Sequence, residues 1–377
     1  GNFPYLATYG TNSSYNYLIN GSKPVIVKAP GLVAPDFTWE TVTQMDFGFD
    51  ASFLNNRLTG TFDWYRRNTK DMLVAGATLP ATLGASVPKS NSADMKTIGW
   101  ELSLGWNDRL ENGFSYWVKG VLSDYQATIT KYAGNDAGFY SQSDGDGKYY
   151  VGQKIGEIWG YHSNGLFQSD DEAATIDQSE LYAGKWGAGD VKYEDLDNDG
   201  KITKGEETIY NPGDKSIIGN KTPRYQFGIT VGFDYKNFDF EMFWQGTGKR
   251  DYMLSGAQFW GFTSQWDVPY TPALDYWTET NTDAYFPRPG WQNGGNRVTS
   301  DRYLQSAAYG RLKNLTVGYT IPKNLTTKWG ISRLRLYVTG ENLLTITPLN
   351  DAFDPETLGG MTYPINRKVA IGLNLTL

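Results

Sequence analysis

The amino-acid sequence predicts an all-β fold, namely part of a large transmembrane antiparallel β-barrel with about nine strands and long extracellular loops. Three observations lead to this prediction. Long runs of residues alternate between apolar side chains and polar or small ones. The connections between these runs alternate between short polar turns and long polar loops. Aromatic residues make up 15% of the chain, and a barrel uses such residues as girdles at both membrane interfaces.

The alternation is clearest in the last run, Arg367–Leu377. Because successive side chains of a β-strand point to opposite faces, one face carries only apolar residues, namely Val369, Ile371, Leu373, Leu375 and Leu377. A soluble β-sandwich would bury such a face in its core, whereas a membrane barrel would turn it toward lipid. The run is about as long as the roughly 9–11 residues that a tilted strand needs to cross a bilayer. Sandwich strands usually have about 5–6 residues, so length favours the barrel.

Nine runs of this kind follow one another along the chain. The expected strands are Thr38–Phe53, Leu58–Trp64, Trp100–Trp106, Phe114–Lys131, Tyr225–Tyr235, Phe238–Trp244, Arg311–Ile321, Arg333–Ile346 and Arg367–Leu377. We expect tight turns at Leu54–Asn56 and Lys236–Asn237, because Asn tolerates the positive φ of such turns. A loop is expected over Leu73–Lys96, and much longer ones over residues 132–222 and 246–308.

The alternation of short and long connections also predicts an orientation. In bacterial barrels the long loops lie outside the cell and the short turns face the periplasm. The last strand should therefore finish on the periplasmic side, and counting back makes residues 1–36 an extracellular loop. Bacterial single-chain barrels have even strand numbers, and an unpaired strand edge is not tolerated in lipid. At least one further strand is therefore expected upstream of these nine.

Composition excludes several classes of function. The net charge of −7 and the pI near 5.0 argue against a nucleic-acid partner. The absence of Cys excludes disulfides and thiolate metal sites. His162 is the only histidine, and we interpret it as structural, so we expect no catalytic residues and no enzyme. The first residues lack the pattern of a signal peptide, which suggests that the chain is a mature protein or a fragment.

Several spaced motifs carry a resemblance to a known family. They are Trp39–Met72, Tyr309–Tyr319, Arg333–Thr345 and Tyr363–Arg367, in that order. Together they resemble the C-terminal end of SusC/RagA-type TonB-dependent outer-membrane transporters of Bacteroidetes. The resemblance implies that residues 37–377 form the C-terminal part of such a barrel in the cell outer membrane, surrounded by lipid. The N-terminal strands and the plug of the family would then lie outside this sequence.

The resemblance also implies a function. Proteins of this family import glycan or peptide fragments with a SusD-like surface lipoprotein and with energy supplied through TonB, which contacts the N-terminal part. The substrate-binding residues stay unknown at this stage. Two alternatives remain open, a calcium-dependent carbohydrate-binding β-sandwich and a passive porin. Within the first long loop, Gly156–Tyr161 and Gly165–Gln168 resemble family segments and are expected to form short strands outside the membrane.

The first long loop also contains a complete twelve-residue calcium-loop pattern. Asp195, Asp197 and Asp199 occupy positions one, three and five, and Glu206 occupies position twelve. Lys201, at position seven, would contribute its backbone carbonyl. Calcium prefers oxygen ligands of this kind, so the pattern predicts a structural Ca²⁺ site. The alternative is a polar turn with solvated carboxylates.

The second long loop is rich in aromatic residues. They are Phe259, Trp260, Phe262, Trp266, Tyr270, Tyr276 and Trp277. Such side chains can stack on sugar rings or hold peptides, but we expect most of them to pack within the loop or at the barrel rim.

Overall fold

The computed structural model describes residues 5–12, 18–23, 25–28, 30–35, 37–75, 80, 82, 84, 87–133, 135, 138–139, 149–358 and 363–377. Its main feature is a nine-stranded antiparallel sheet with the order β17-β16-β15-β12-β11-β6-β5-β4-β3. The strands are β3 (Thr41–Phe53), β4 (Leu58–Ala75), β5 (Lys89–Arg109), β6 (Ser115–Tyr132), β11 (Arg224–Tyr235), β12 (Phe238–Lys249), β15 (Tyr309–Thr320), β16 (Arg333–Ile346) and β17 (Lys368–Thr376). Neighbours in the sheet are also neighbours in sequence among these nine strands, as expected for an up-and-down barrel wall. The predicted fold class is confirmed, and one continuous sheet replaces the two packed sheets that the sandwich alternative requires.

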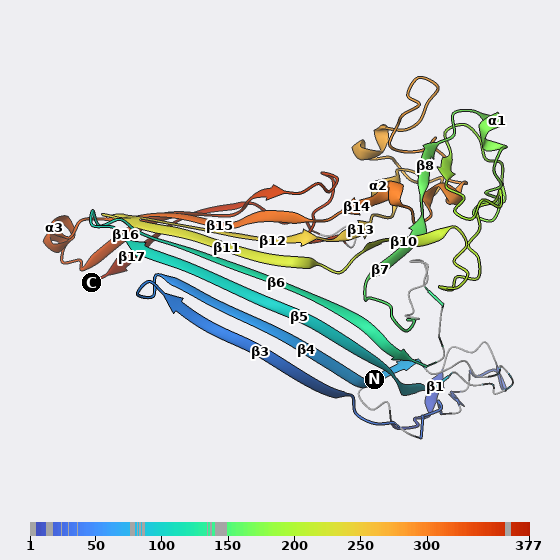
Figure 1. Cartoon of the computed structure of the whole chain (residues 1–377), viewed down its shortest axis with the longest axis horizontal. Coiled ribbons are helices and arrows are strands. Elements are labelled where there is room, and N and C mark those ends of the chain that lie inside the picture. The colour runs from blue at the N-terminus through green and yellow to red at the C-terminus, as the bar shows by residue number, and fades with distance from the viewer. Residues whose placement is uncertain are drawn as a thin grey trace.

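The sheet is long, curved and open (Figure 1). Its edge strands are β3 and β17, which do not pair with each other. The short turns and the C-terminus lie at one end of the sheet, whereas the long loops and the N-terminal strand β1 lie at the other (Figure 1). The two ends therefore correspond to the periplasmic and extracellular sides that the sequence predicts.

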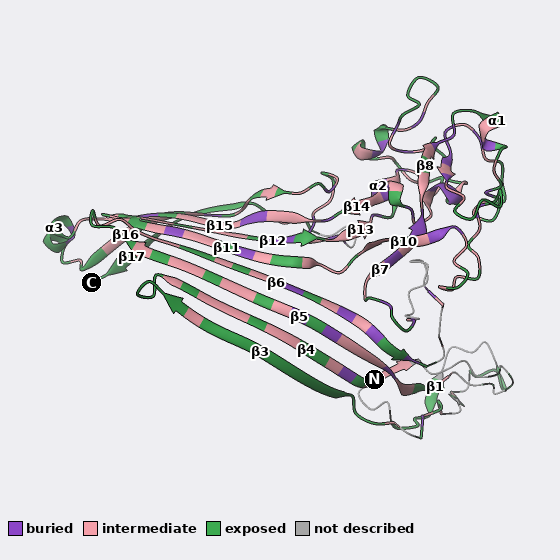
Figure 2. Cartoon of the chain, in the orientation of Figure 1, coloured by how far each residue is buried: buried purple, intermediate pink, exposed green. Residues whose placement is uncertain are grey.

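The register gives the sheet one apolar face and one mixed face. A row of directly paired residues crosses six strands on the apolar face, namely Tyr116, Phe233, Phe240, Val317, Val338 and Ile371. The neighbouring row on the opposite face is Trp117, Gly232, Glu241, Thr316, Thr339 and Ala370. Val317, Val338 and Ile371 of the apolar row are exposed, whereas Tyr116, Phe233 and Phe240 are half-buried among their neighbours. Figure 2 shows the edge strand β3 exposed along most of its length. An exposed apolar face on this scale is typical of a surface that lies in lipid.

Aromatic side chains lie at two levels of the apolar face. At the periplasmic end, the Trp106 indole N–H donates to the Tyr116 hydroxyl over 3.1 Å. Toward the extracellular end, Trp64 and Trp100 are directly paired on β4 and β5. Tyr and Trp favour membrane interfaces because one end of the side chain is apolar and the other polar. Trp106 and Tyr116 therefore mark the periplasmic interface. The roughly 9–11 residues of a membrane-crossing strand, counted along β5 from Trp106, place the extracellular interface near Lys96, beyond the tryptophan pair.

The loop expected over Leu73–Lys96 is much shorter in the structure, because β4 continues to Ala75 and β5 begins at Lys89. The alternation fails there because both strands carry irregularities, at Thr69–Leu73 and at Asp94–Met95. A local core covers one face of the extension. It consists of Ala93, Ile129 and Tyr132 with Met72, Val74, Met95, Tyr149 and Ile155.

The remaining elements are short. Residues expected as loop near the N-terminus contain a small hairpin of β1 (Gly10–Asn12) and β2 (Ile26–Lys28). The extracellular elements are β7 (Glu157–Tyr161), β8 (Ser163–Leu166), α1 (Asp170–Ala173), β9 (Val191–Tyr193), β10 (Lys215–Asn220), β13 (Asp251–Met253), α2 (Ala257–Trp260), η2 (Thr271–Leu274), η3 (Gly294–Arg297), η4 (Asp301–Tyr303) and β14 (Leu304–Ser306). The strands β7 and β8 confirm the expected short strands, and they pair with β10 and β9. At the periplasmic end, α3 (Lys323–Thr326) and η5 (Thr327–Trp329) connect β15 to β16. Within the described ranges, no helix is long and apolar enough to cross a membrane.

Candidate functional site

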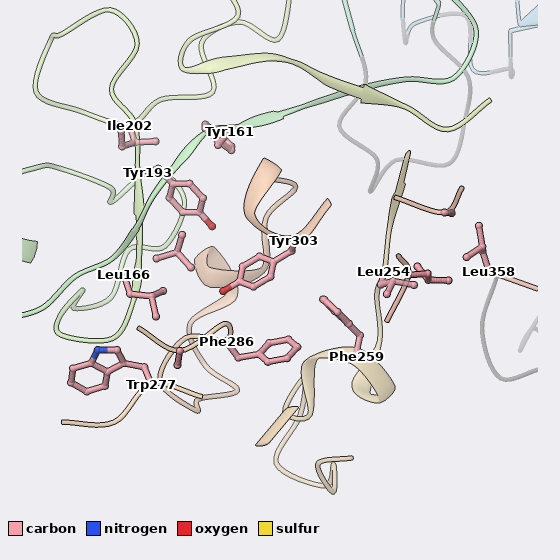
Figure 3. Close-up of a cluster of buried hydrophobic side chains, with 14 residues drawn as sticks. Tyr161, Leu166, Tyr193, Ile202, Leu254, Phe259, Trp277, Phe286, Tyr303 and Leu358 are labelled. Carbon is pink, nitrogen blue, oxygen red and sulfur yellow. The ribbon is translucent and has the colours of Figure 1, made fainter. Parts of the chain in front are cut away.

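The two long loops pack together into one extracellular assembly, which we define as residues 149–223 and 250–308. Its core contains Tyr193, Phe259, Phe286 and Tyr303, and Figure 3 shows how such side chains from both loops lie around one centre. The Phe259 and Phe286 rings are 5.1 Å apart between centroids. Burial raises the pKa of Tyr193 well above its usual value, because ionisation inside this core is unfavourable. The assembly thus has a water-excluding core outside the membrane.

Polar contacts also join the two loops. The Asp190 carboxylate, which is buried, accepts hydrogen bonds from the Gly187 N–H and the Asn296 side-chain amide, over 2.9 and 2.8 Å. The Asn296 carbonyl in turn accepts from the Val191 N–H over 2.8 Å. The Tyr193 hydroxyl donates to the Gly295 carbonyl over 2.6 Å. Because these groups are buried and paired, they fix the relative position of the loops.

Most of the aromatic residues singled out in the second loop belong to this packing, as expected. Phe259 and Trp277 are buried, whereas Trp260, Phe262 and Tyr276 are partly buried. Two others differ, since Trp266 is 83% and Tyr270 50% exposed. Tyr270 lines an open hollow of about 540 Å³ together with residues 350–352. Of the seven aromatic residues singled out, Trp266 and Tyr270 are therefore the two whose side chains remain open to a ligand or a partner.

His162 connects three segments of the assembly. Its Nδ1 lies 2.7 Å from an Asp301 carboxylate oxygen, and its Nε2 lies 2.7 Å from the Ser216 hydroxyl. Asp301 also accepts the Ser163 N–H over 3.0 Å. The residue types are those of a hydrolase triad, but Ser216 lies inside the paired strand β10 rather than on a nucleophile turn. We interpret the set as a clamp between β8, β10 and η4.

The predicted calcium loop forms a compact turn. The two Asp195 carboxylate oxygens accept the N–H groups of Asn198 and Gly200, over 2.7 and 2.8 Å. The Asp199 carboxylate accepts the Lys201 N–H over 2.8 Å. Asn198 and Gly200 both have positive φ, which the tight turn requires. The loop therefore has the local backbone that the sequence pattern predicts.

The carboxylates that gather here are only partly those of the predicted set. Ligand atoms of Asp195, Asp197 and Asp214 all lie within 4.8 Å of one another. Across the described part of the chain, this group includes neither Asp199 nor Glu206. Glu206 is exposed, and its N–H donates to the Asn211 carbonyl over 3.0 Å. The sequence pattern did not predict Asp214, because the twelve-residue calcium loop begins at Asp195 and ends at Glu206, before that residue.

A reversal of the chain after Thr203 brings Asp214 into the loop. Gly205 and Gly213, both with positive φ, lie against each other, and a Cβ on Gly205 would come within 2.4 Å of the Gly213 nitrogen. The buried Asp214 carboxylate accepts the Leu196 and Thr203 N–H groups, each over 2.7 Å. The two glycines and the following acid were the signal in the sequence that marked this fold-back.

The electrostatics of the three carboxylates are unequal. Asp197 is exposed, but partial loss of hydration within the turn raises the pKa of its carboxyl, and the nearby carboxylates Asp199, Asp214 and Asp195 add to that rise. Burial acts in the same direction on Asp195, but the N–H donors of Gly200, Asn198 and Asp199 outweigh it and lower the pKa of Asp195. None of the ion pairs within the described ranges involves these carboxylates. Three hard oxygen donors without a paired cation fit a divalent ion such as Ca²⁺.

The inner wall of the sheet carries a second group of charges. The Arg311 guanidinium, 2% exposed, lies 2.6 Å from Asp354 and 3.0 Å from Glu356. Glu356 also lies 2.9 Å from the Lys313 ammonium. These contacts fix the connection between β16 and β17 against β15 at the extracellular end. Nearer the periplasmic end, Arg335 pairs with Asp239 beside an open hollow of about 560 Å³. The inner wall is thus polar and charged, as expected for a surface that faces water.

Comparisons with known proteins agree with this geometry. The model of the family described as "TonB dependent receptor-like, beta-barrel" matches residues 2–343. TonB-dependent receptor P3 of Formosa agariphila is 29% identical over 99% of this chain and 38% of its own length. TonB-dependent receptor SusC of Bacteroides thetaiotaomicron is 26% identical over 99% of this chain and 35% of its own length. The chain thus spans less than two fifths of the curated relatives that it matches.

A solved structure shows the same fold. A chain in the structure of the RagAB peptide transporter superposes with a TM-score of 0.75, at 22% identity, over 100% of this chain and 39% of that chain. The predicted resemblance and the outer-membrane location are therefore confirmed. The protein belongs to the TonB-dependent receptor-like β-barrel family, and its nine-stranded sheet is part of the wall of an outer-membrane β-barrel.

Proposed function

We propose that this chain is the C-terminal part of a TonB-dependent importer that takes up glycan or peptide fragments through the barrel lumen. The observation that carries this proposal is the two-faced sheet, with an apolar outer face and a charged inner wall beneath a folded extracellular assembly. An apolar outer face allows the sheet to lie in lipid, whereas a polar inner wall keeps the lumen hydrated for polar solutes. The role is transport without covalent chemistry.

Uptake by a deletion strain tests this proposal. Cells lacking the gene should lose growth on one class of candidate nutrient, either oligosaccharides or peptides, and a plasmid copy should restore it. The comparison of the two classes decides between glycan and peptide. Normal uptake of every candidate by the deletion strain would refute an import function.

Dependence on TonB separates this function from a passive porin. An energised importer should stop when a protonophore collapses the proton-motive force, whereas diffusion through a porin should continue. The same protonophore should leave binding of the nutrient at the cell surface unchanged. Uptake that persists at its full rate without the proton-motive force would favour the porin.

We further propose that a SusD-like surface lipoprotein docks on the extracellular assembly. Support comes from four exposed apolar residues in one segment, namely Trp266, Val268, Tyr270 and Leu274. Such a cluster is typical of an interaction surface, in which Trp and Tyr often dominate the binding energy. Trp266→Ala in the full-length protein should weaken copurification of the lipoprotein by about tenfold or more. Asn164→Ala, on β8 of the same assembly, serves as the control, and equal copurification by both variants would argue against this surface.

We propose that the loop from Asp195 to Glu206 holds a structural Ca²⁺ ion, with Asp195 and Asp197 as ligands. Asp199, the Lys201 carbonyl and Glu206 remain ligands predicted by the sequence pattern, and Asp214 is added by the structure. Like charges at ~4 Å repel by about 1 kcal/mol even in water, and a cation would offset this repulsion. The ion would hold one extracellular loop in a fixed shape at the mouth of the barrel.

Calcium titration of the full-length protein tests the site. Calcium in the millimolar range, which suits weak extracellular sites of ~0.1–1 mM affinity, should slow hydrogen exchange over residues 195–214. Magnesium should protect less, because it requires near-ideal octahedral geometry and gives up its waters reluctantly. Equal hydrogen exchange with calcium and with a chelator would mean that the loop is a polar turn that binds no calcium.

A further inference from the structure

The strands β4, β5 and β6 are longer than the membrane requires, and their extracellular extensions carry a charged outer face. Beyond the paired Trp64 and Trp100, the outward positions of β4 are Arg66, Asn68 and Lys70, which follow Trp64 at every second residue. On β5, Lys96 is the second outward position beyond Trp100. In the first row beyond this tryptophan pair, the exposed apolar residues Met45 and Ile98 lie on either side of Arg66. The next row, with Asn68 and Lys96, is polar and basic.

The register places several of these side chains in one row. Thr43 pairs with Asn68, Asn68 with Lys96, Lys96 with Thr128, and Thr128 with Lys154. Residues directly opposite in a sheet share a face, so the row crosses β3, β4, β5, β6 and the segment beside β6. Every side chain in this row offers hydrogen-bond donors, and none is a carboxylate. We call Arg66, Lys70, Lys96 and Lys154 the basic outer patch.

The cations of the basic outer patch lack acidic partners. Across the described ranges, none of the four takes part in an ion pair. Arg66, Lys70 and Lys154 are exposed, and Lys96 is partly exposed. The Arg66 Nε–H donates to the Asn68 side-chain amide oxygen over 3.3 Å.

Three carboxylates of the surrounding segments are engaged with other groups. Asp94 accepts the Asp71 N–H over 3.0 Å, and Asp124 pairs with Arg224. Glu157 accepts the Tyr150 hydroxyl over 2.5 Å and the Lys154 N–H over 3.1 Å. The basic outer patch therefore presents uncompensated positive charge, although the whole chain has a net charge of −7.

We propose that the basic outer patch binds the phosphate groups of anionic glycolipid in the outer leaflet of the outer membrane. The patch lies on the lipid-facing side around Lys96, which is about as far along β5 from Trp106 as a membrane-crossing strand extends. This is the depth of the lipid head groups. Long Lys and Arg side chains at that depth extend to the head groups, and both bind phosphate well. This inference goes beyond the proposed import function and does not depend on the nutrient or on TonB.

Lipid binding by the full-length protein tests the proposal. The probe is bisphosphorylated lipid A in neutral detergent, compared with the same lipid A after removal of its phosphates, and native mass spectrometry measures bound lipid. The variant R66Q/K70Q/K96Q/K154Q should bind the bisphosphorylated lipid at least about tenfold more weakly, since each cation near an anionic surface contributes roughly fivefold. The wild-type protein should prefer the phosphorylated lipid, and added salt should reduce this preference.

A matched control removes four charges elsewhere. The variant K185Q/K192Q/K204Q/K221Q changes lysines of the extracellular assembly and should bind lipid A as the wild type does. The variant R66K/K96R keeps the charge of the patch and should also retain binding, and heat-modifiable migration of all variants checks that the barrel is folded. Equal lipid binding by the patch variant and the wild type would overturn the proposal, as would an equal loss in the control variant.

Discussion

The transmembrane sheet and the extracellular assembly are stabilised in opposite ways. In the sheet, apolar side chains such as Phe49 point outward and remain 63% exposed, so that lipid replaces a core. In the assembly, Phe259 is fully buried among aromatic neighbours. In the sheet, backbone hydrogen bonds form regular ladders between strands that are neighbours in sequence. In the assembly, hydrogen bonds join residues about a hundred positions apart, such as Tyr193 and Gly295. The sheet is therefore stabilised with its apolar face in lipid, whereas the assembly is stabilised by burying apolar side chains away from water.

The largest expected effect is on the stability of the assembly, and a matched pair of phenylalanine substitutions compares the two environments. Phe259→Ala removes a buried ring from the assembly and should destabilise it by about 3–5 kcal/mol. Phe49→Ala removes a ring that faces lipid and should leave the assembly unchanged. Hydrogen exchange over residues 250–308 measures the difference. Equal protection in both variants would mean that the aromatic cluster does not hold the assembly together.

A second pair compares a buried and an exposed arginine. Arg311→Ala removes a buried guanidinium, leaves Asp354 without its cation and leaves Glu356 with Lys313 alone. It should cost up to about 3–5 kcal/mol, the loss typical of breaking a buried ion pair. Arg57→Ala breaks a solvent-exposed pair with Asp108 and should cost about 0–1 kcal/mol. Thermal unfolding of the full-length protein in detergent measures both losses, and similar values for the two variants would contradict this ranking.

A third test distinguishes the acid that the structure adds from the acid that the pattern predicts. Asp214→Asn removes the charge of a buried acceptor of two backbone N–H groups, with an expected cost of about 1–3 kcal/mol, and should weaken calcium binding by about tenfold or more. Glu206→Gln changes an exposed side chain outside the carboxylate group and should have a smaller effect. Calcium titrations of both variants measure this. A larger loss of calcium affinity for Glu206→Gln would instead support Glu206 as the ligand, as the twelve-residue sequence pattern predicts.

The smallest expected effect is a pH dependence confined to the assembly. Partial loss of hydration and the neighbouring carboxylates raise the pKa of Asp197, whereas calcium binding requires the ionised form. Calcium affinity should therefore fall as the pH drops through this raised pKa, at a higher pH than for an ordinary aspartate. Titrations between about pH 7 and about pH 4 measure the change. Constant affinity over that range would exclude Asp197 as a ligand.

Sequence reasoning predicted the sheet well because its pattern is local. Alternation such as that of Val369, Ile371 and Leu373 is visible without any partner strand, and the nine strands follow from it. The predicted end of a strand is wrong where the strand is irregular, as at Met72, where β4 continues through a register shift. Sequence reasoning also missed Asp214, because only the chain reversal at Gly205 and Gly213 brings that residue to Asp195. Long-range contacts of this kind leave little periodic signal in a sequence.

Accessibility of alternating positions on one strand tests the central claim most directly. The chain contains no cysteine, so single substitutions at Ile229, Thr230 and Val231 of β11 can carry spin labels in the full-length protein, with any other cysteine replaced. In outer membranes, labels at Ile229 and Val231 should relax with oxygen dissolved in lipid. The label at Thr230 should instead relax with a water-soluble nickel complex. Equal or reversed access at the two kinds of position would contradict a sheet with its apolar face in lipid and its polar face toward a hydrated lumen.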